Sequence, residues 1–313
     1  MPTHHRLMAC VAGVVGAALT LTGCVSPTAG SQDDVLTVYA TTGYLADLVA
    51  NVAPDARVTT MVGPGGDPHT YQPSTKDVEE MRSADVVLWN GLHLEAQMVD
   101  QLESLGDRQL AVGEMLPEDM LLDWPETDED GNPLHDPHVW NSPSAWSLVV
   151  GHVADRLGRI DPDRAQEYRV NAEAYQGRIA EAADEAGELL ARVPAPRILI
   201  TGHDAFNYFG RTYDLEVHAT DFVSTEAALS AEEISELARL IADNRVPAIF
   251  QDNQANPQAI TSLSEAVRAR GWQVTIADAE LYADSLGAEP EVDTYLEVLL
   301  HNARTVSAAL GAS

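Results

Sequence analysis

Cysteine is nearly absent from the sequence. The 313 residues include two cysteines, Cys10 and Cys24, and both lie within the first 24 positions. The rest of the chain can therefore form neither an internal disulfide nor a cysteine-ligated metal site. If side chains of this region bind a metal ion, the ligands must be histidine, aspartate or glutamate.

Lysine is also scarce, and positive charge is low overall. Lys76 is the only lysine, and the formal net charge at pH 7 is −31. A surface with this charge repels nucleic acid and anionic ligands and attracts cations weakly, without selecting among them. We therefore expect no nucleic-acid partner, and we attribute the overall charge to solubility.

Long apolar runs are missing apart from one near the N-terminus. Residues 7–21 form an apolar run that is short for a membrane span and typical of a secretory leader. The run ends in Leu-Thr-Gly-Cys, which resembles the lipobox of bacterial lipoproteins. That resemblance implies a signal peptide at 1–23 and lipid attachment at Cys24, followed by a small, polar tether at 24–34. The alternative is an ordinary leader with a chance cysteine.

The remaining sequence alternates short β-rich runs with helical stretches. The expected strands are 35–40, 57–63, 84–91, 108–113, 197–202, 215–220, 246–253 and 272–277. Apolar runs separated by helices are typical of parallel sheets built from β-α units. We predict an α/β protein with two similar lobes, at 35–160 and 194–313, each with a parallel-type central sheet.

One long helix is expected between the lobes, at 161–193. Apolar residues recur there in steps of three and four from Tyr168 to Val193, which is helical spacing. Asp161 and Pro162 are expected to begin the helix. A helix of this length can join two lobes rigidly, and the alternative is a long surface helix within one domain.

The segment 114–136 differs from the rest of the chain. It is rich in aspartate and glutamate, contains several prolines and has no lysine or arginine. We predict an exposed loop. It could collect divalent cations weakly, or it could be a plain solvated insertion, and the sequence leaves both open.

The tripeptide Asp-Pro-His occurs twice, at 67–69 and at 136–138. Proline restrains the backbone beside His69 and His138, and both histidines lie shortly before expected helix starts. His203 has a similar setting, directly after an expected strand. In α/β proteins this edge of the sheet is where ligands bind. The three histidines are therefore candidates for one shared site.

A metal ion is the ligand that these side chains suit. Helix starts carry partial positive charge, which disfavours imidazolium, so we expect three neutral histidines, the form that binds metals. Asp284, beyond the last expected strand, is the fourth candidate. Three imidazoles and one carboxylate can complete a tetrahedral site for Zn²⁺. Any one of these residues alone is weak support, because a lone histidine near a helix start is more often a cap or a surface group.

Five segments together resemble a known family: GGDPHTYQPSTKDV, ADVVLWNGLHLE, DPHVW, TGHDAFNYF and LYADSLG. In order and spacing they resemble the metal-binding lipoproteins of bacterial ABC importers for zinc and manganese, the ZnuA/TroA group. The likeness covers residues 35–310. It implies two lobes joined by one rigid helix, with the metal held between them by His69, His138, His203 and Asp284.

The resemblance also implies partners and a location. They are a membrane permease with its ATPase, a lipid anchor and an extracytoplasmic position, and we expect a monomer. Manganese-preferring relatives often have glutamate at the place of His203, and three imidazoles favour Zn²⁺. We therefore expect Zn²⁺ as the transported ion, with Mn²⁺ or Fe²⁺ as the alternative.

An enzymatic role is not expected. Four protein ligands leave no coordination position for a hydrolytic water, and neither His-Glu-x-x-His nor Gly-x-Ser-x-Gly occurs in the sequence. A secreted metallohydrolase and a surface adhesin are the alternatives. Three further carboxylates, Asp67, Asp136 and Asp252, are candidates for orienting the ligands through hydrogen bonds, although the first two could also merely shape their turns.

Overall fold

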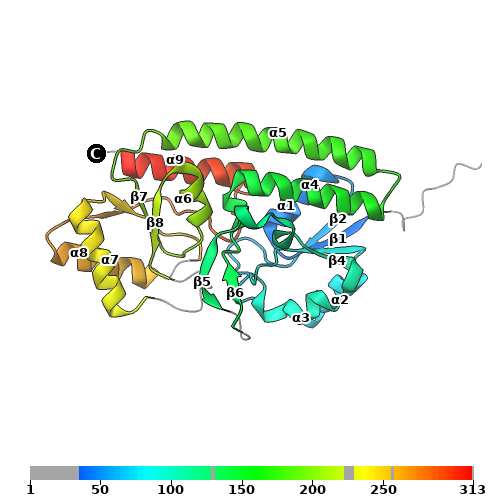
Figure 1. Ribbon diagram of the computed structural model, residues 1–313, viewed down its shortest axis with the longest axis horizontal. Coiled ribbons are helices and arrows are strands. Elements are labelled where there is room, and N and C mark those ends of the chain that lie inside the picture. The colour runs from blue at the N-terminus through cyan, green and yellow to red at the C-terminus, as the bar shows by residue number, and fades with distance from the viewer. Residues whose placement is uncertain (1–34, 128–130, 222–228, 255–256, 312–313) are drawn as a thin grey trace, which may run out of the picture. The chain divides into compact units, whose positions relative to one another are not determined.

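The computed structural model describes residues 35–127, 131–221, 229–254 and 257–311 (Figure 1). The expected leader, tether and lipid-attachment residue Cys24 lie outside the described residues. The described residues belong to one compact unit that begins at Val35. Among the helices of these ranges, none combines the length and the apolarity that crossing a lipid bilayer requires.

Four parallel strands form the central sheet of the N-terminal lobe, by which we mean the described chain before the long helix α5. They are β1 (Thr37–Ala40), β2 (Arg57–Thr60), β3 (Val86–Trp89) and β4 (Gln109–Ala111), in the order β2-β1-β3-β4. Parallel neighbours need a crossover, and three helices lie in these crossovers: α1 (Gly43–Val52), α2 (Thr75–Ser83) and α3 (Val99–Glu103). The four expected strands of this half are confirmed.

Serine caps fix the helices that follow the two Asp-Pro-His tripeptides. The side chain of Ser74 accepts a hydrogen bond from Asp77 N, and Asp77 Oδ2 accepts one from Ser74 N, which makes a capping box at α2. Ser142 caps α4 (Pro143–Ile160), where Pro143 occupies the first helical position. Each cap sets the direction in which the chain leaves a histidine loop.

The acidic segment 114–136 is not a plain loop, contrary to expectation. Within it β5 (Asp123–Thr127) pairs antiparallel with β6 (Pro133–His135), although residues 128–130 lie outside the description. Trp124 lies on β5, is 4% exposed and contacts the ring of His93 with centroids 6.2 Å apart, so an aromatic side chain joins the hairpin to the lobe. Acidic residues and prolines are poor strand formers, which explains why the pattern did not predict it.

Short 3-10 turns complete the N-terminal lobe, namely η1 (Ala96–Met98), η2 (Gly106–Arg108), η3 (Gly113–Met115), η4 (Glu118–Met120) and η5 (Val139–Asn141). The last of these begins directly after His138.

The expected long helix is α5 (Ala165–Leu190), whose 26 residues span about 39 Å. Its start differs from the expectation, because Asp161 ends α4 instead of beginning α5. Asp161 Oδ2 accepts hydrogen bonds from Arg164 Nε (2.7 Å) and the Tyr168 hydroxyl (2.9 Å). These bonds hold a short turn, and α4 and α5 then pack side by side (Figure 1).

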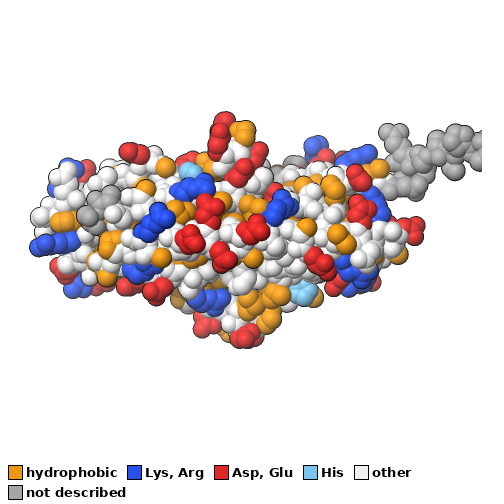
Figure 2. Space-filling model, turned by 90° about the horizontal axis from the view of Figure 1, so that it is seen from above, with side chains coloured by type: hydrophobic (Ala, Val, Ile, Leu, Met, Phe, Trp, Pro, Cys, Tyr) orange, Lys and Arg blue, Asp and Glu red, His pale blue; other side chains and the backbone are white. Residues whose placement is uncertain are grey.

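The outer face of α5 is polar. Figure 2 shows the molecule from this side, with acidic and basic side chains interspersed among apolar ones. On this face the excess of negative charge is therefore spread out, as expected for a solvated surface.

The C-terminal lobe, the described chain after α5, also contains parallel strands. β7 (Ile198–Thr201) pairs with β8 (Glu216–Ala219), and β9 (Ala248–Ile249) pairs with β10 (Thr275–Ile276). A hydrogen bond of 2.8 Å from Phe250 N to Ile200 O joins the two pairs. The helices of this lobe are α6 (Asn207–Tyr213), α7 (Ala231–Asn244), α8 (Pro257–Ala269) and α9 (Tyr295–Gly311). The four strands expected in this half are confirmed.

The cores of the two lobes share chain segments. On α9, Val298 packs into the core around the first sheet, whereas Leu299 packs into the core of the second. Tyr208 on α6 belongs to the first core, although it comes from the C-terminal lobe. The fold is α/β, with parallel central sheets and one long helix, while the lobe boundaries at 160/161 and 193/194 stay a prediction.

Candidate metal centre

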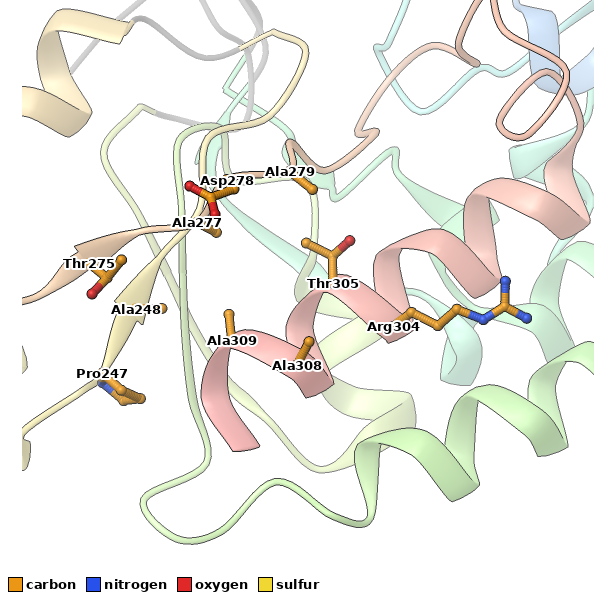
Figure 3. A pocket seen from close by; sticks show the side chains of 10 residues that line it. All are labelled: Pro247, Ala248, Thr275, Ala277, Asp278, Ala279, Arg304, Thr305, Ala308 and Ala309. Atoms are coloured by element: carbon orange, nitrogen blue, oxygen red, sulfur yellow. The ribbon is translucent and has the colours of Figure 1, made fainter. Parts of the chain in front are cut away.

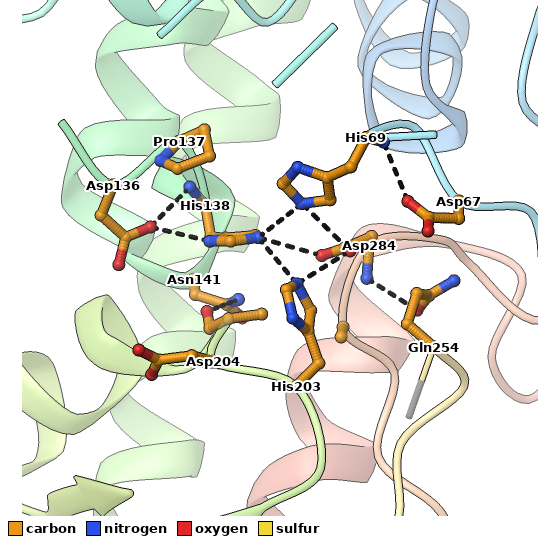
Figure 4. A network of polar contacts seen from close by, with 12 residues as sticks. Asp67, His69, Asp136, Pro137, His138, Asn141, His203, Asp204, Gln254 and Asp284 are labelled. Carbon is orange, nitrogen blue, oxygen red and sulfur yellow. Dashed lines mark hydrogen bonds and ion pairs between the residues drawn. The ribbon is translucent and has the colours of Figure 1, made fainter. Parts of the chain in front are cut away.

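Four side chains from four separate loops converge at the carboxyl ends of the strands (Figure 4). His69 lies after β2, His138 before η5, His203 between β7 and α6, and Asp284 between β10 and α9. His69 is 3% exposed and the other three are fully buried. Among the described residues, their ligand atoms form a group lying within 4.8 Å of one another.

The distances within this group are short and similar. The Nε2 atom of His138 lies 3.2 Å from that of His69 and 3.1 Å from that of His203. Asp284 approaches all three rings. Its Oδ1 lies 3.3 Å from His138 Nε2, and its Oδ2 lies 3.1 Å from His203 Nε2 and 3.5 Å from His69 Nε2.

These distances can be compared with a coordination tetrahedron. In a regular tetrahedron the distance between two ligands is about 1.63 times the metal–ligand bond. Separations of 3.1–3.5 Å therefore correspond to bonds of about 1.9–2.1 Å, close to the values typical of zinc with imidazole and carboxylate ligands. These five separations fit a tetrahedral site for a small dication, and all four ligand atoms lie within 4.8 Å of one another.

The carboxylate of Asp284 is the negative group of the cluster. Both its oxygens are buried, and the groups that face them among the described residues are the three imidazoles. A buried charge of this kind needs a compensating positive charge. The three imidazoles that face it can supply that charge when they are protonated, and a bound cation can supply it when they are neutral.

In the site without metal, the electrostatics depart from the expectation of neutral histidines at two of the three rings. Burial lowers the pKa of His138, but Asp284 and Asp136 outweigh burial and raise that pKa to about 10. The pKa of His203 is also raised, because the attraction of Asp284 exceeds the effect of burial. Only His69 has a lowered pKa, and burial is the main cause. The expectation was based on the partial charge of helix starts and omitted these carboxylates. A full negative charge beside an imidazole changes its pKa more than a helix dipole does.

The pKa of Asp284 moves in the opposite direction. Burial alone would raise it, but His203 and His138 lower it well below the usual range. In the absence of a cation, the cluster therefore holds a carboxylate together with protonated imidazole. Those protons must leave when a cation takes their place.

Asp136 orients the ring of His138. Its Oδ1 lies 2.7 Å from His138 Nδ1 and accepts a hydrogen bond of 2.9 Å from His138 N. Because Nδ1–H donates to this carboxylate, the lone pair of Nε2 points toward the other ligands once the ring is neutral.

The other two candidate carboxylates act on the backbone. Asp67 Oδ1 accepts a hydrogen bond of 2.8 Å from His69 N. Asp252 Oδ2 accepts hydrogen bonds from Gly202 N (3.0 Å) and His203 N (2.8 Å). These two carboxylates thus set the loops, whereas Asp136 reaches the ring of His138.

Several contacts of the cluster were missed by sequence reasoning. The carbonyl oxygen of Ala283 accepts hydrogen bonds from the Tyr44 hydroxyl (3.0 Å) and Trp140 Nε1 (2.9 Å), which fixes the chain just before Asp284. Helix α6 has no side-chain cap, and Asp204 Oδ1 accepts a hydrogen bond of 3.0 Å from Asn207 Nδ2. No local pattern signals such pairs, because most of the partners are far apart in sequence.

A cavity of about 590 Å³ lies elsewhere, between β9, β10 and α9 (Figure 3). Its walls include small side chains such as Ala248 and Ala308. At its edge, Arg304 pairs with Glu185 at 2.7 Å. None of the four clustered side chains lines this cavity. The groups with metal-binding chemistry lie in the buried cluster instead.

Comparison with known proteins places this geometry in a family. Residues 38–309 match the family described as "Zinc-uptake complex component A periplasmic". The chain is 35% identical to the zinc-binding protein TroA of Treponema pallidum, over 98% of this chain and 99% of the relative. It is 34% identical to the manganese-binding lipoprotein MntA of Bacillus subtilis, over 96% of this chain and 98% of the relative.

Solved structures agree with these matches. The periplasmic zinc-binding protein TroA from Treponema pallidum superimposes with a TM-score of 0.82 at 36% identity, covering 88% of this chain and 99% of that one. A further relative, the iron-binding protein YfeA of Yersinia pestis, is 28% identical over 88% of this chain and 86% of its own length. The chain therefore belongs to the family of the periplasmic zinc-uptake component A, the metal-binding components of ABC importers, which are transport proteins and not enzymes.

Proposed function

We propose that this protein captures Zn²⁺ outside the cytoplasm and delivers it to the permease of an ABC importer. His69, His138, His203 and Asp284 are the proposed ligands. The observation that carries the proposal is that five of the six pairs of ligand groups lie 3.1–3.5 Å apart, as in a tetrahedron with bonds of about 2.0 Å. Zinc is the transported cargo in this proposal.

The closed character of the site supports capture without chemistry. All four ligands come from the protein, and the cluster is buried, so a bound ion would have no free position for a reacting water. This argues against the metallohydrolase alternative. It also means that the ion can leave only if the ligand loops separate.

A second cargo, Mn²⁺, is favoured by one feature. Both oxygens of Asp284 face the imidazoles and lack other donors among the described residues, so the carboxylate could bind through both. Two carboxylate oxygens and three nitrogens would give five coordination, which suits an ion with a preference for oxygen ligands. The relatives bear names for zinc, manganese and iron.

The test is a competition between the two ions. Trp140 lies against the ring of His138, with centroids 5.3 Å apart, so its fluorescence can report metal binding. Protein stripped with a chelator should bind one Zn²⁺, and a large excess of Mn²⁺ should fail to displace it. Displacement of Zn²⁺ by equimolar Mn²⁺ would reverse the assignment of the cargo. Elemental analysis of protein purified without added metal gives the resident ion directly.

The proposed setting includes a lipid anchor at Cys24, a tether at 24–34 and a monomer docking on the permease and its ATPase. The lipoprotein names of relatives support an anchored, extracytoplasmic position. Replacing Cys24 by alanine should release the protein from the membrane fraction without changing Zn²⁺ affinity. Retention of the variant in that fraction would contradict anchoring through this residue.

A further inference from the structure

Three carboxamide side chains connect the two lobes around the cluster. Asn141 in the N-terminal lobe donates from Nδ2 to the carbonyl oxygen of Ala205 in the C-terminal lobe, at 2.8 Å. Asn141 follows His138 by three residues, and Ala205 follows His203 by two. This one bond therefore links two ligand segments that belong to different lobes.

Asn207 makes the second connection. Its Nδ2 donates to Asp136 Oδ2 at 3.1 Å and to Asp204 Oδ1 at 3.0 Å. Asp136 is the carboxylate that holds the ring of His138, and Asp204 follows His203 directly. The amide of Asn207 thus donates to one carboxylate from each lobe. Without it, the two carboxylates would face each other as like charges.

Gln254 makes the third connection, on the other side of the cluster. Its Nε2 donates to the carbonyl oxygen of Gly66 at 2.9 Å, in the loop that leads to His69. Its Oε1 accepts a hydrogen bond from Asp284 N at 3.2 Å. Gln254 therefore ties the backbone of one ligand to the loop of another across the two lobes.

Amides suit this position because they carry no charge. A lysine or arginine so close to the cluster would repel a bound dication, and an extra carboxylate would compete with Asp284 for it. An amide can donate across the gap without either effect. Each amide also bonds to a segment that carries a ligand, although none of the three amides belongs to the ligand cluster itself.

We propose that Asn141, Asn207 and Gln254, which we call the amide clasp, set the rate at which the cation is released while leaving its coordination unchanged. The inference rests on the proposed function, since it describes the release of the cargo. The buried cation cannot leave until ligand segments of the two lobes separate, and that separation breaks the bonds of the clasp. Loss of one such bond should accelerate release by about 3- to 10-fold.

The test measures release and coordination separately. Release is the rate of Zn²⁺ transfer to an excess of a chromogenic chelator, followed by stopped flow. Coordination is read from the visible absorption of the Co²⁺-loaded protein, because the band position and intensity report its ligand geometry. We expect Asn207→Ala and Gln254→Ala to accelerate release by about 3- to 10-fold, with an unchanged Co²⁺ spectrum. Asn141→Ala should do the same.

A matched control comes from another asparagine. Asn171 donates from Nδ2 to the carbonyl oxygen of Val52 at 3.0 Å, which joins α5 to α1 and touches no ligand segment. Asn171→Ala removes a bond of the same kind and should leave release unchanged. Asn141 is nearly buried, whereas Asn207 and Gln254 are partly exposed. If the Asn141 variant fails to fold, the other two variants still decide the matter.

Two outcomes would overturn the inference. One is an unchanged release rate in the Asn207 and Gln254 variants. The other is a shifted Co²⁺ spectrum together with faster release, since the amides would then position the ligands and not control the opening. Failure of the proposed function would look different, because the unaltered protein would then bind neither Zn²⁺ nor Co²⁺ with one-to-one stoichiometry.

Discussion

Binding of Zn²⁺ should release protons at neutral pH, and its affinity should rise with pH well above neutrality. The pKa of His138 is about 10 in the metal-free protein, because Asp284 and Asp136 outweigh the effect of burial. The pKa of His203 is also raised. At pH 7 the imidazole of His138 carries a proton that a metal ion must displace, since imidazole binds metal only in its neutral form.

The size of the effect follows from His138 alone. Displacing a proton from a group with a pKa of about 10 at pH 7 costs about 4 kcal/mol, at 1.36 kcal/mol per pH unit. The apparent affinity should therefore rise about tenfold for each pH unit between 6 and 9, and more steeply where His203 also loses a proton. If the histidines were neutral at pH 7, the apparent affinity would fall only below about pH 6.5.

Calorimetry can measure this directly. The binding enthalpy of Zn²⁺ at one pH is measured in buffers with different ionisation enthalpies, and the slope gives the number of protons released. We expect at least one proton at pH 7. A chelator competition whose own pH dependence is known then gives the affinity from pH 6 to pH 8.5. Zero proton release, together with an affinity that stays constant over this range, would refute the reasoning.

Asp136→Asn provides the control for the cause. The change removes one of the two carboxylates that raise the pKa of His138, while an amide oxygen can still accept from Nδ1. Proton release at pH 7 should decrease in this variant. Unchanged release would mean that Asp136 does not set the protonation of His138.

Four further outcomes are expected. His203→Ala should weaken Zn²⁺ binding at least about tenfold by calorimetry, and an unchanged affinity would remove His203 from the site. Asp252→Ala should lower the free energy of unfolding by about 1–3 kcal/mol in denaturant titrations, because Gly202 N and His203 N lose their buried acceptor. The metal-free protein should become less stable between pH 7 and pH 10, since the raised pKa of His138 stabilises the fold only while the ring is protonated; a stability that stays constant would contradict this. Small-angle scattering with and without Zn²⁺ should differ little, because α9 packs into both cores, and a large compaction would count against the shared cores.

Short-range patterns predicted the elements that carry the ligands. The apolar run at 84–91 corresponds to β3, whose four residues are all buried. The apolar spacing from Tyr168 onward corresponds to α5. The expected helix start after His138 is α4, with Ser142 as its cap and Pro143 as its first residue. These features follow from interactions within a few residues, which a sequence displays directly. The clustering of the four candidate ligands was expected from the family resemblance, and the loop settings of three of them only suggested it.

Long-range pairs were not predictable in the same way. Asn207 reaches Asp136 across 71 positions, and Tyr44 reaches the carbonyl of Ala283 across 239. No periodicity marks such partners, because each pair depends on how two finished elements are placed. The hairpin of β5 and β6 was missed for a related reason, since its pairing overrides the low strand preference of its residues.

The surroundings of Asp284 show how both lobes position one proposed ligand. From the N-terminal lobe, Tyr44 and Trp140 hold the carbonyl of Ala283. From the C-terminal lobe, Asn253 Oδ1 accepts a hydrogen bond of 2.9 Å from Ala283 N. The peptide before the carboxylate is thus fixed from two sides, and a movement of either lobe must break bonds or carry Asp284 with it. A carboxylate held in this way keeps its negative charge at the centre of the cluster, where it would attract a cation and raises the pKa of His138. The same fixed carboxylate would therefore favour a bound cation and also favours a proton on His138, which competes with that cation.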